Sequence, residues 1–480
     1  MATAILDDLL GELTGRARDQ VVKGLAAVLR AAPGGGRRAV EIDAVSVDNL
    51  IEPITRRMCA QIDEILHHPA VQRLESAWRG IRFVVERAQF TENIAIEVCH
   101  CTKQELTDDF ADAAEISQSG LYRVVYSTSF ATFGGKPYGL ICADFEFGPG
   151  AEDLGLLRQC AAVAAMAHSP FITNVGADFF GLRSFADLPR VRDLGAILSG
   201  PRYRLWHAFR DTEDARYVGL CLPRFLLRAP YRPDTDPFQP LRFREHVEAS
   251  HEHHLWGHAC FAFAVRAADS FARYRWCVYL IGSRASGMVE DLVRHEFPTM
   301  RSLTARSPSE CLLTTRMEHV LSDEGFIGLV YDRSSGNAMF HSAASVHKPR
   351  RFADTEEGRA AATGERLGAQ LPYMFLVCRL AHFLKWVQRE KIGQWNDRGA
   401  LQRELDTWLR QYVSDVDDPH WETRSRRPLR KAAIIIEAVS GQNGWYRCHL
   451  KLQPHLTHNA ANFSLALLGR LERVSDTREE

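Results

Sequence analysis

The sequence predicts an α/β protein in which mixed sheets are flanked by helices. The strongest strand signal lies near the C-terminus, where the β-branched run Ile434-Ile435-Ile436 is followed by Asn443-Gly444. Both residues of that dipeptide tolerate positive φ, as a type I′ turn requires, so the pattern predicts a β-hairpin over residues 432–454. The strongest helix signal is the apolar stretch 371–393, which has Pro372 in its first turn and ends at Gly393.

The second strand of this hairpin has an apolar and a polar face, because successive side chains of a strand point in opposite directions. The apolar set is Tyr446, Cys448, Leu450 and Leu452, and the polar set is Arg447, His449, Lys451 and Gln453. Pro454 lacks an N–H to donate, so we expect the strand to stop there.

The hairpin is also the candidate functional site. A two-stranded ribbon is marginal in water, and its unpaired edges can template another strand. Because few residues follow Pro454, we expect another chain to cover the ribbon; the alternative is an ordinary hairpin within the chain's own sheet. The candidate interface residues are Ile434, Ile435, Ile436, Val439, Asn443, Gly444, Tyr446, Leu450 and Leu452.

The composition is that of an average globular protein, with 480 residues, 46% hydrophobic and 25% charged. A net charge of −1 provides no overall field that would favour nucleic acid. Eleven scattered cysteines indicate reduced thiols. Asp7 and Asp8 interrupt the early apolar stretch, and no apolar run reaches the roughly 20 residues that span a bilayer, so we expect a cytoplasmic protein.

The domain organisation follows from the breaks in these patterns. Residues 1–45 predict a helical arm that ends in a flexible linker around Gly34-Gly35-Gly36. We assign residues 46–370 to the main domain or domains. Residues 371–480 then form a C-terminal domain that holds the central helix and the hairpin.

Within the main domain, the order of elements begins with helices and continues with strands. Apolar residues recur at helical spacing over 47–85, including Leu74, Trp78 and Val85. Residues 94–147 predict strands, among them LYRVVY at 121–126. An apolar run after Tyr217 predicts a buried strand. The arginines along this region indicate internal ion pairs or a charged interface; they are Arg210, Arg216, Arg224 and Arg228.

Three patterns allow chemistry. If residues 251–258 are helical, His251, His254 and His258 share one face and could bind Zn²⁺ or Ni²⁺, as in a metal-dependent hydrolase. A polar helix start is the favoured interpretation. Cys378 and His382 are four residues apart and could form a nucleophile–base pair, but no third group orients them, and core packing is favoured. Asp144 and Glu146 share a strand face, where a solvated or ion-paired edge is favoured over acid–base chemistry, because no histidine or lysine is near them in the sequence.

Several blocks of the sequence, in collinear order over about residues 45 to 470, resemble a single family. They are ILHHPAVQRLESAWRG at 65–80, GGKPYG with ADFEF at 134–147, SPFI at 169–172, ARYVGLCLPRFLLRAPY at 215–231, LWGHA at 255–259, LPYMFLVCRLAHFLK at 371–385, RRPL at 426–429 and PH at 454–455. On these blocks the chain resembles the large subunit (TssC or VipB) of the contractile sheath of bacterial type VI secretion systems.

The resemblance implies a phage-tail-sheath-like α/β protein with no catalytic activity, no cofactor and no metal. It implies a heterodimer with a small sheath subunit of the TssB or VipA type. Such dimers would polymerise with copies of themselves around an inner tube of Hcp-type rings, and contraction would drive effector translocation. The C-terminal hairpin would exchange strands between subunits.

Further partners implied by the resemblance are a baseplate and a ClpV-type AAA+ unfoldase. We expect neither nucleic-acid binding nor membrane insertion. Besides the hydrolase, the remaining alternative is a sheath protein of another phage-tail-like contractile particle.

Overall fold

The structure is a computed structural model of the chain. It describes residues 44–470 apart from 133, 234–240, 242, 283–286, 299–302, 391–397, 415, 417–418, 439–444 and 456–462. The chain divides into two compact units, one made of Met1–Arg73 with Pro230–His254 and the other of Leu74–Ala229 with Leu255–Glu480. The predicted N-terminal arm lies outside the described residues except for its last two positions.

In the smaller unit, two carboxylates tie the helix α3 (Ala44–Leu66) and the turn after it to the segment that returns at residue 230. Asp63 pairs with His246 at 2.5 Å. The buried Glu245 lies 3.4 Å from His67 and accepts a hydrogen bond from the backbone N–H of Tyr231. The unit is therefore held together by polar contacts between two distant stretches of sequence.

The larger unit is built on a six-stranded sheet in the order β1-β2-β3-β9-β10-β6. The first four strands are parallel, and β10 is antiparallel to both of its neighbours. The strands are β1 (Ile141–Phe147), β2 (Phe171–Val175), β3 (Val218–Leu222), β9 (Phe326–Asp332), β10 (Asn337–Phe340) and β6 (Met288–Val289). Parallel strands covered on both faces have nearly continuous apolar sequences, as VGLCL in β3 shows.

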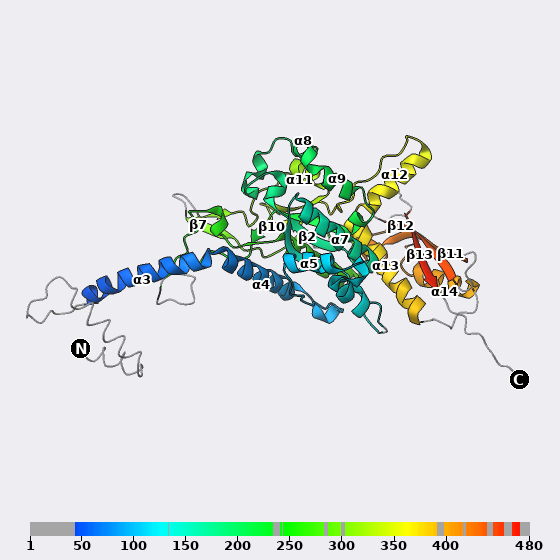
Figure 1. Cartoon of the computed structure of the whole chain (residues 1–480), viewed down its shortest axis with the longest axis horizontal. Helices are drawn as coiled ribbons and strands as arrows, with labels where there is room; N and C mark the ends of the chain where they lie inside the picture. The colour runs from blue at the N-terminus through cyan, green and yellow to red at the C-terminus, as the bar shows by residue number, and fades with distance from the viewer. Residues whose placement is uncertain are drawn as a thin grey trace, which may run out of the picture. The chain divides into compact units, whose positions relative to one another are not determined.

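The sheet has a hydrophobic core on each face, and alternate residues of its strands contribute to each. Phe171, Leu220 and Phe326 belong to one core, which includes much of helix α7 (Ala151–Ala167). The residues that follow them in sequence, Ile172, Cys221 and Ile327, belong to the other core with helix α10 (Ala259–Tyr274). Figure 1 shows α7 next to β2 in the larger unit.

The arginines of the region 210–228 form internal ion pairs, which confirms that prediction. Each meets a glutamate from a distant part of the chain: Arg210 with Glu324 at 2.5 Å, Arg216 with Glu365 at 2.9 Å, Arg224 with Glu310 at 2.8 Å and Arg228 with Glu75 at 2.9 Å. Because a guanidinium buried without a partner is costly, these pairs fix the surrounding segments against one another.

Over residues 94–147 the predicted strands are confirmed only for β1, and the prediction of a strand over residues 121–126 is wrong. Those residues begin in a short helix, α6 (Gly120–Tyr122), and continue into a π-helical turn, Arg123–Thr128. The carboxylate of Asp109 accepts the backbone N–H of Gly120, and the hydroxyl of Ser119 accepts that of Tyr122. These caps satisfy the helix N-terminus and outweigh the β-propensity of the two valines.

The predicted central helix is α13 (Leu371–Glu390), and most of its described side chains are buried. The other elements are α4 (Pro69–Arg87), α5 (Lys103–Asp112), α8 (Leu194–Leu198), α9 (Arg204–Arg210), α11 (Thr315–Asp323), α12 (Glu356–Gly368), α14 (Arg398–Arg410), α15 (Trp421–Arg426), β4 (Phe225–Leu226), β5 (Trp256–Gly257), β7 (His295–Pro298) and β8 (Leu303–Arg306). Among the described residues, no helix combines the length and the apolar character needed to cross a membrane.

Candidate functional site

The predicted hairpin exists and is part of a three-stranded antiparallel sheet, β11-β12-β13. Its strands are β11 (Leu429–Ala438), β12 (Trp445–Pro454) and β13 (Phe463–Arg470), shown with α14 in Figure 1. The face that carries Ile434, Ile436, Leu450 and Leu452 is at most 2% exposed and packs with residues of α13 and α14. The opposite face of the hairpin is exposed or half-buried at its described positions.

The outer edge of β11 is only partly covered. At one end Leu429 exchanges backbone hydrogen bonds with the segment 412–414. Further along, the N–H of Ile434 donates to the carboxylate of Asp406 at 3.4 Å, and its C=O accepts from the amide of Gln402 at 3.3 Å. Because backbone groups alternate in direction along a strand, Ala432 and Ile436 also direct their N–H and C=O groups outward.

The other edge of the sheet is β13. It pairs with β12 from Trp445↔Arg470 to Leu452↔Phe463. Within the described part of the chain, no further strand pairs with β13, and none pairs with β11 beyond the Val413–Leu429 bridge. The sheet therefore ends on both sides in edges that a strand from another polypeptide can extend.

A second candidate interface is an exposed apolar face on α4. One face packs inward, with Gly80 against Phe261 and the Phe83 ring 5.1 Å from that of Phe225. The opposite face exposes large apolar side chains: Leu74 is 62% exposed, Trp78 63% and Val85 39%. Apolar side chains gathered on one helix face mark a protein contact more often than scattered ones do.

Comparison with known proteins points to one assembly. The models of two family domains match: the EvpB/VC_A0108 tail sheath N-terminal domain over residues 48–347, and the EvpB/VC_A0108 tail sheath gpW/gp25-like domain over residues 360–471. The type VI secretion system sheath protein TssC1 of Pseudomonas aeruginosa is 34% identical over 441 residues, which cover 90% of this chain and 88% of that protein. The chain belongs to the type VI secretion sheath family. It is a structural sheath subunit of the large type, and the hydrolase alternative is not favoured.

The hairpin residues that the sequence singled out fall into three groups in this sheath protein. Ile434, Ile436, Leu450 and Leu452 are buried in the chain's own core. Ile435 is half-buried on the opposite face. Val439, Asn443 and Gly444 lie outside the described residues, and Tyr446 is placed in β12 by its backbone alone. The side chains that pack in the core and the backbone groups that point away from the sheet are therefore different groups of the same strands.

The expectation that another chain covers the ribbon is wrong for one edge. Residues after Pro454 do supply a strand, β13, which occupies the outer edge of β12. A strand of eight residues suffices for this, because β12 already offers the row of backbone partners. The open edges of the sheath protein are consequently those of β11 and β13.

His251, His254 and His258 do not share a helix face. Residues His251–His253 form a single 3₁₀ turn, His254 is extended at φ −73° and ψ 143°, and α10 begins only after His258, its N-cap. The Trp256–Gly257 strand lies between them and sets a different spacing. The i, i+3, i+7 geometry on which the metal hypothesis depended is therefore absent from this stretch.

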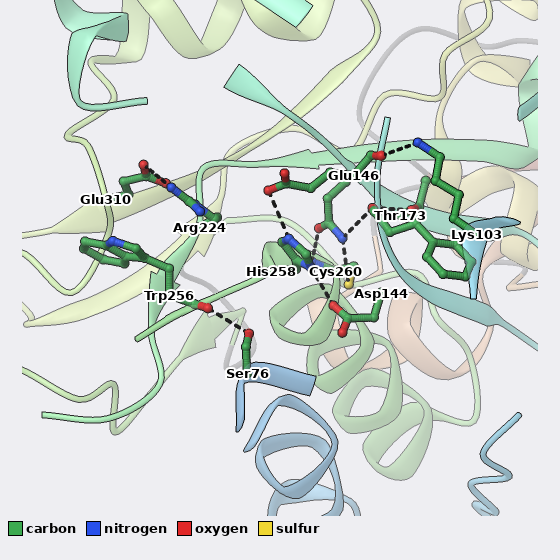
Figure 2. Close-up of polar contacts among 12 residues, drawn as sticks. Ser76, Lys103, Asp144, Glu146, Thr173, Arg224, Trp256, His258, Cys260 and Glu310 are labelled. Carbon is green, nitrogen blue, oxygen red and sulfur yellow. Dashed lines mark hydrogen bonds and ion pairs between the residues drawn. The ribbon is translucent and has the colours of Figure 1, made fainter. Parts of the chain in front are cut away.

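His258 has another role, which Figure 2 shows. Its ring lies between two carboxylates of β1, with Nδ1 2.5 Å from Asp144 and Nε2 3.0 Å from Glu146. Burial acts to lower the pKa of His258, but the hydrogen bonds and charges of both carboxylates outweigh it and raise the pKa to about 10. Burial likewise opposes ionisation of Glu146, yet the contact with His258 leaves its pKa below the ordinary value. Of the two alternatives for Asp144 and Glu146, a solvated or an ion-paired edge, the structure shows the ion-paired one, with a histidine that comes from a distant part of the sequence.

Cys378 and His382 are both buried, and burial raises the pKa of the Cys378 thiol. The Nε2 of His382 lies 2.8 Å from the C=O of Ala167 at the end of α7, so this histidine joins two helices. Desolvation lowers the pKa of His382 to about 4. A deeply buried, protonated thiol is a poor nucleophile, so core packing is the better account of this pair.

Sequence reasoning missed the two residues that cover the β11 edge, Asp406 and Gln402, and the exposure of the α4 face. The apolar spacing of Leu74, Trp78 and Val85 was visible, but periodicity shows only that a face is apolar, not what covers it. Asp406 and Gln402 are four residues apart on α14, so their spacing predicts that they share a helix face. It does not predict that this face contacts β11.

Proposed function

We propose that this chain pairs with a small sheath subunit of the TssB or VipA type and polymerises, with further copies of the pair, into a contractile sheath around an Hcp-type inner tube. The observation that carries the proposal is the C-terminal sheet, whose packed face is complete and whose two edges are open. Family membership supports the same role.

Strand addition at these edges joins neighbouring subunits. Each added backbone hydrogen bond contributes about 0.5–1.5 kcal/mol net, so a joint of a few residues is modest by itself. In a lattice, every subunit already held by one contact meets the next at a high effective concentration, so many modest joints act together. A main-chain ribbon also permits the domains on its two sides to rotate, as contraction requires.

The exposed face of α4 is the surface we assign to the small subunit. Trp78 and Leu74 are large apolar groups close together on a helix that is anchored by its opposite face. Burying them against a partner removes apolar area from water, which favours association, and tryptophan is frequent among residues that dominate binding. The contact at α4 can therefore hold the heterodimer together independently of strand pairing at the sheet edges.

The role is mechanical rather than catalytic, and the sheath assembles in the cytoplasm. Attachment to a baseplate and disassembly of the contracted sheath by a ClpV-type AAA+ unfoldase belong to the same proposal, on the strength of the family resemblance. Contraction itself needs no nucleotide at this subunit, because it is the rearrangement of a metastable lattice.

Co-expression with a candidate small subunit tests the proposal. We expect a one-to-one complex on affinity purification and tubes in negative-stain electron micrographs. Trp78→Asp should reduce recovery of the small subunit at least about tenfold, because a charge would be buried in the contact. Val98→Asp is the matched control, since Val98 is a similarly exposed apolar side chain, 61% exposed, in a loop rather than on α4.

Two results would contradict the proposal at different points. If the unchanged pair never forms tubes, the sheath role is wrong. If Trp78→Asp recovers the small subunit as well as Val98→Asp does, the partner binds elsewhere.

A further inference from the structure

The larger unit carries a strongly basic surface over residues 183–205. Its five arginines are all exposed: Arg183, Arg190, Arg192, Arg202 and Arg204. Two carboxylates lie in the same stretch. Asp187 pairs with Arg190 at 2.7 Å, and Asp193 caps α8 by accepting the N–H of Ala196. The other four guanidinium groups make no ion pair with any described residue. We call this region the basic surface.

The basic surface is rigidly supported. The Tyr203 hydroxyl donates to the C=O of Phe179 at 2.6 Å, and Nε2 of His207 lies 2.9 Å from the C=O of Leu198, which joins α9 to α8. Trp206 and Phe209 are completely or almost completely buried beneath it. The arginines are thus presented on a preorganised surface, which lowers the entropy cost of binding.

The chemistry of the basic surface favours a protein partner over a nucleic acid. Two apolar side chains lie among the arginines, with Ile197 37% and Leu205 50% exposed. Arginine with aliphatic neighbours is typical of protein interfaces. Single-stranded nucleic acid is bound on exposed aromatic rings, and both aromatic residues among the described residues 183–205, Phe185 and Tyr203, are buried.

A complementary acidic surface exists on the same unit. Glu105, Asp108, Asp112 and Glu115 are exposed at spacings of three, four and three residues, along α5 and just beyond its end. No lysine or arginine occurs between Lys103 and Arg123. Lys103 itself is engaged by Asp153 at 2.7 Å. We call these four carboxylates the acidic stripe.

One copy cannot bring the two surfaces together, since α8 and α5 are well separated within the unit in Figure 1. We propose that the basic surface of one copy docks on the acidic stripe of a second copy. The proposal rests on the proposed sheath function and names one of its lattice contacts. Two different patches meeting head to tail form a heterologous contact, which builds an open helical polymer rather than a closed dimer. A net charge of −1 leaves no whole-chain repulsion to oppose it.

Charge reversal tests the contact in the full chain co-expressed with its small subunit. The basic variant is Arg192→Glu with Arg202→Glu and Arg204→Glu. The acidic variant is Asp108→Lys with Asp112→Lys and Glu115→Lys. The control reverses three exposed arginines elsewhere: Arg333→Glu, Arg351→Glu and Arg366→Glu. The readout is the polymerised fraction by sedimentation and electron microscopy, with heterodimer recovery as the check on folding.

We expect each reversed surface to reduce the polymerised fraction at least about tenfold at low salt, because like charges then face each other. The variant that combines both reversals should recover to within about threefold of the unchanged chain, since opposite charges meet again. The control should polymerise normally, and nuclease treatment should change nothing.

Three outcomes would overturn the contact alone: normal sheaths from either reversed surface, no recovery in the combined variant, or sensitivity to nuclease. If only the basic variant fails, a different acidic partner occupies that surface. Failure of the unchanged pair to form sheaths would instead overturn the proposed function, and this contact with it.

Discussion

Two sheets of the larger unit, the six-stranded sheet and the sheet β11-β12-β13, differ in how their edge strands are protected. β1 ends the six-stranded sheet, and its outer side is guarded: the ammonium of Lys103 binds the C=O of Glu146 at 2.7 Å, and the register shifts between Cys142 and Glu146. Charged side chains surround it, with His258 between Asp144 and Glu146. A bulge, a lysine and charges are the devices that keep edge strands from pairing.

The edge of β11 lacks most of this protection. Among the described residues, Asp406 and Gln402 hydrogen-bond to the outward backbone groups of Ile434, and none does so at Ala432 or Ile436. No bulge interrupts β11 after Lys431. The contrast agrees with the proposal that the six-stranded sheet is complete within one chain, whereas β11 pairs with a strand of a neighbouring subunit.

The largest effect should come from blocking the β11 edge with proline. Ala432→Pro removes an outward N–H and should abolish sheath assembly while the chain still folds. Ala433 pairs with Lys451 of β12, so Ala433→Pro removes an internal ladder bond instead and should lower the free energy of unfolding by about 1–3 kcal/mol. Electron microscopy and urea denaturation separate the two effects. Normal tubes from Ala432→Pro would show that the edge is not a joint.

The packed face of the same sheet should be sensitive in stability. Leu450 is fully buried, so Leu450→Ala should lower the free energy of unfolding by about 2–5 kcal/mol. Ile435 is half-buried on the opposite face, and Ile435→Ala should cost roughly 1 kcal/mol or less. Equal losses in urea denaturation would contradict the assignment of the two faces.

At the guarded edge, His258→Gln should lower the free energy of unfolding by about 2 kcal/mol near pH 7, because two carboxylates lose their shared cation. The folded-state pKa of about 10 lies above the ordinary 6.5, so this stabilisation is complete below pH 6.5 and is lost as the pH rises through 10.

The difference between His258→Gln and the unchanged chain should therefore shrink between pH 7 and 9.5 in thermal or urea unfolding. His246→Gln is the control, since His246 pairs with Asp63 but its side chain is 70% exposed. A difference that stays constant over this range would show that His258 is not held as a cation.

The smallest effect should follow Lys103→Met, which removes the contact to the outer C=O of Glu146 and the ion pair with Asp153. Both groups are partly exposed, so the loss should be about 0.5–1.5 kcal/mol. Freeing the β1 edge should also increase light scattering on heating relative to Lys348→Met, a substitution at an exposed lysine. Equal scattering would show that Lys103 does not guard the edge.

Local signals in the sequence were sufficient for the elements with strong patterns. The Asn443-Gly444 turn signal and the alternation along β12 predicted the hairpin, because turn chemistry and side-chain period act over a few residues. The apolar length of α13 predicted a buried helix for the same reason. The helical patterns and blocks collinear with the sheath family also predicted the family that the comparisons show.

Tertiary structure decided what those local patterns leave open. Contacts between residues far apart in sequence decide which strand lies on the outer edge of β12. They also decide whether the apolar face of α4 with Leu74, Trp78 and Val85 faces the core or the solvent. LYRVVY became helical because Asp109, eleven residues before Gly120, caps it. His258 lies between Asp144 and Glu146 because it is the N-cap of α10, which packs against β1. Spacing along the chain shows which residues can share a face of a helix or strand. Which residues pack against that face depends on the tertiary fold. Those residues in turn determine how buried the face is, which charges it meets and which strand pairs with it.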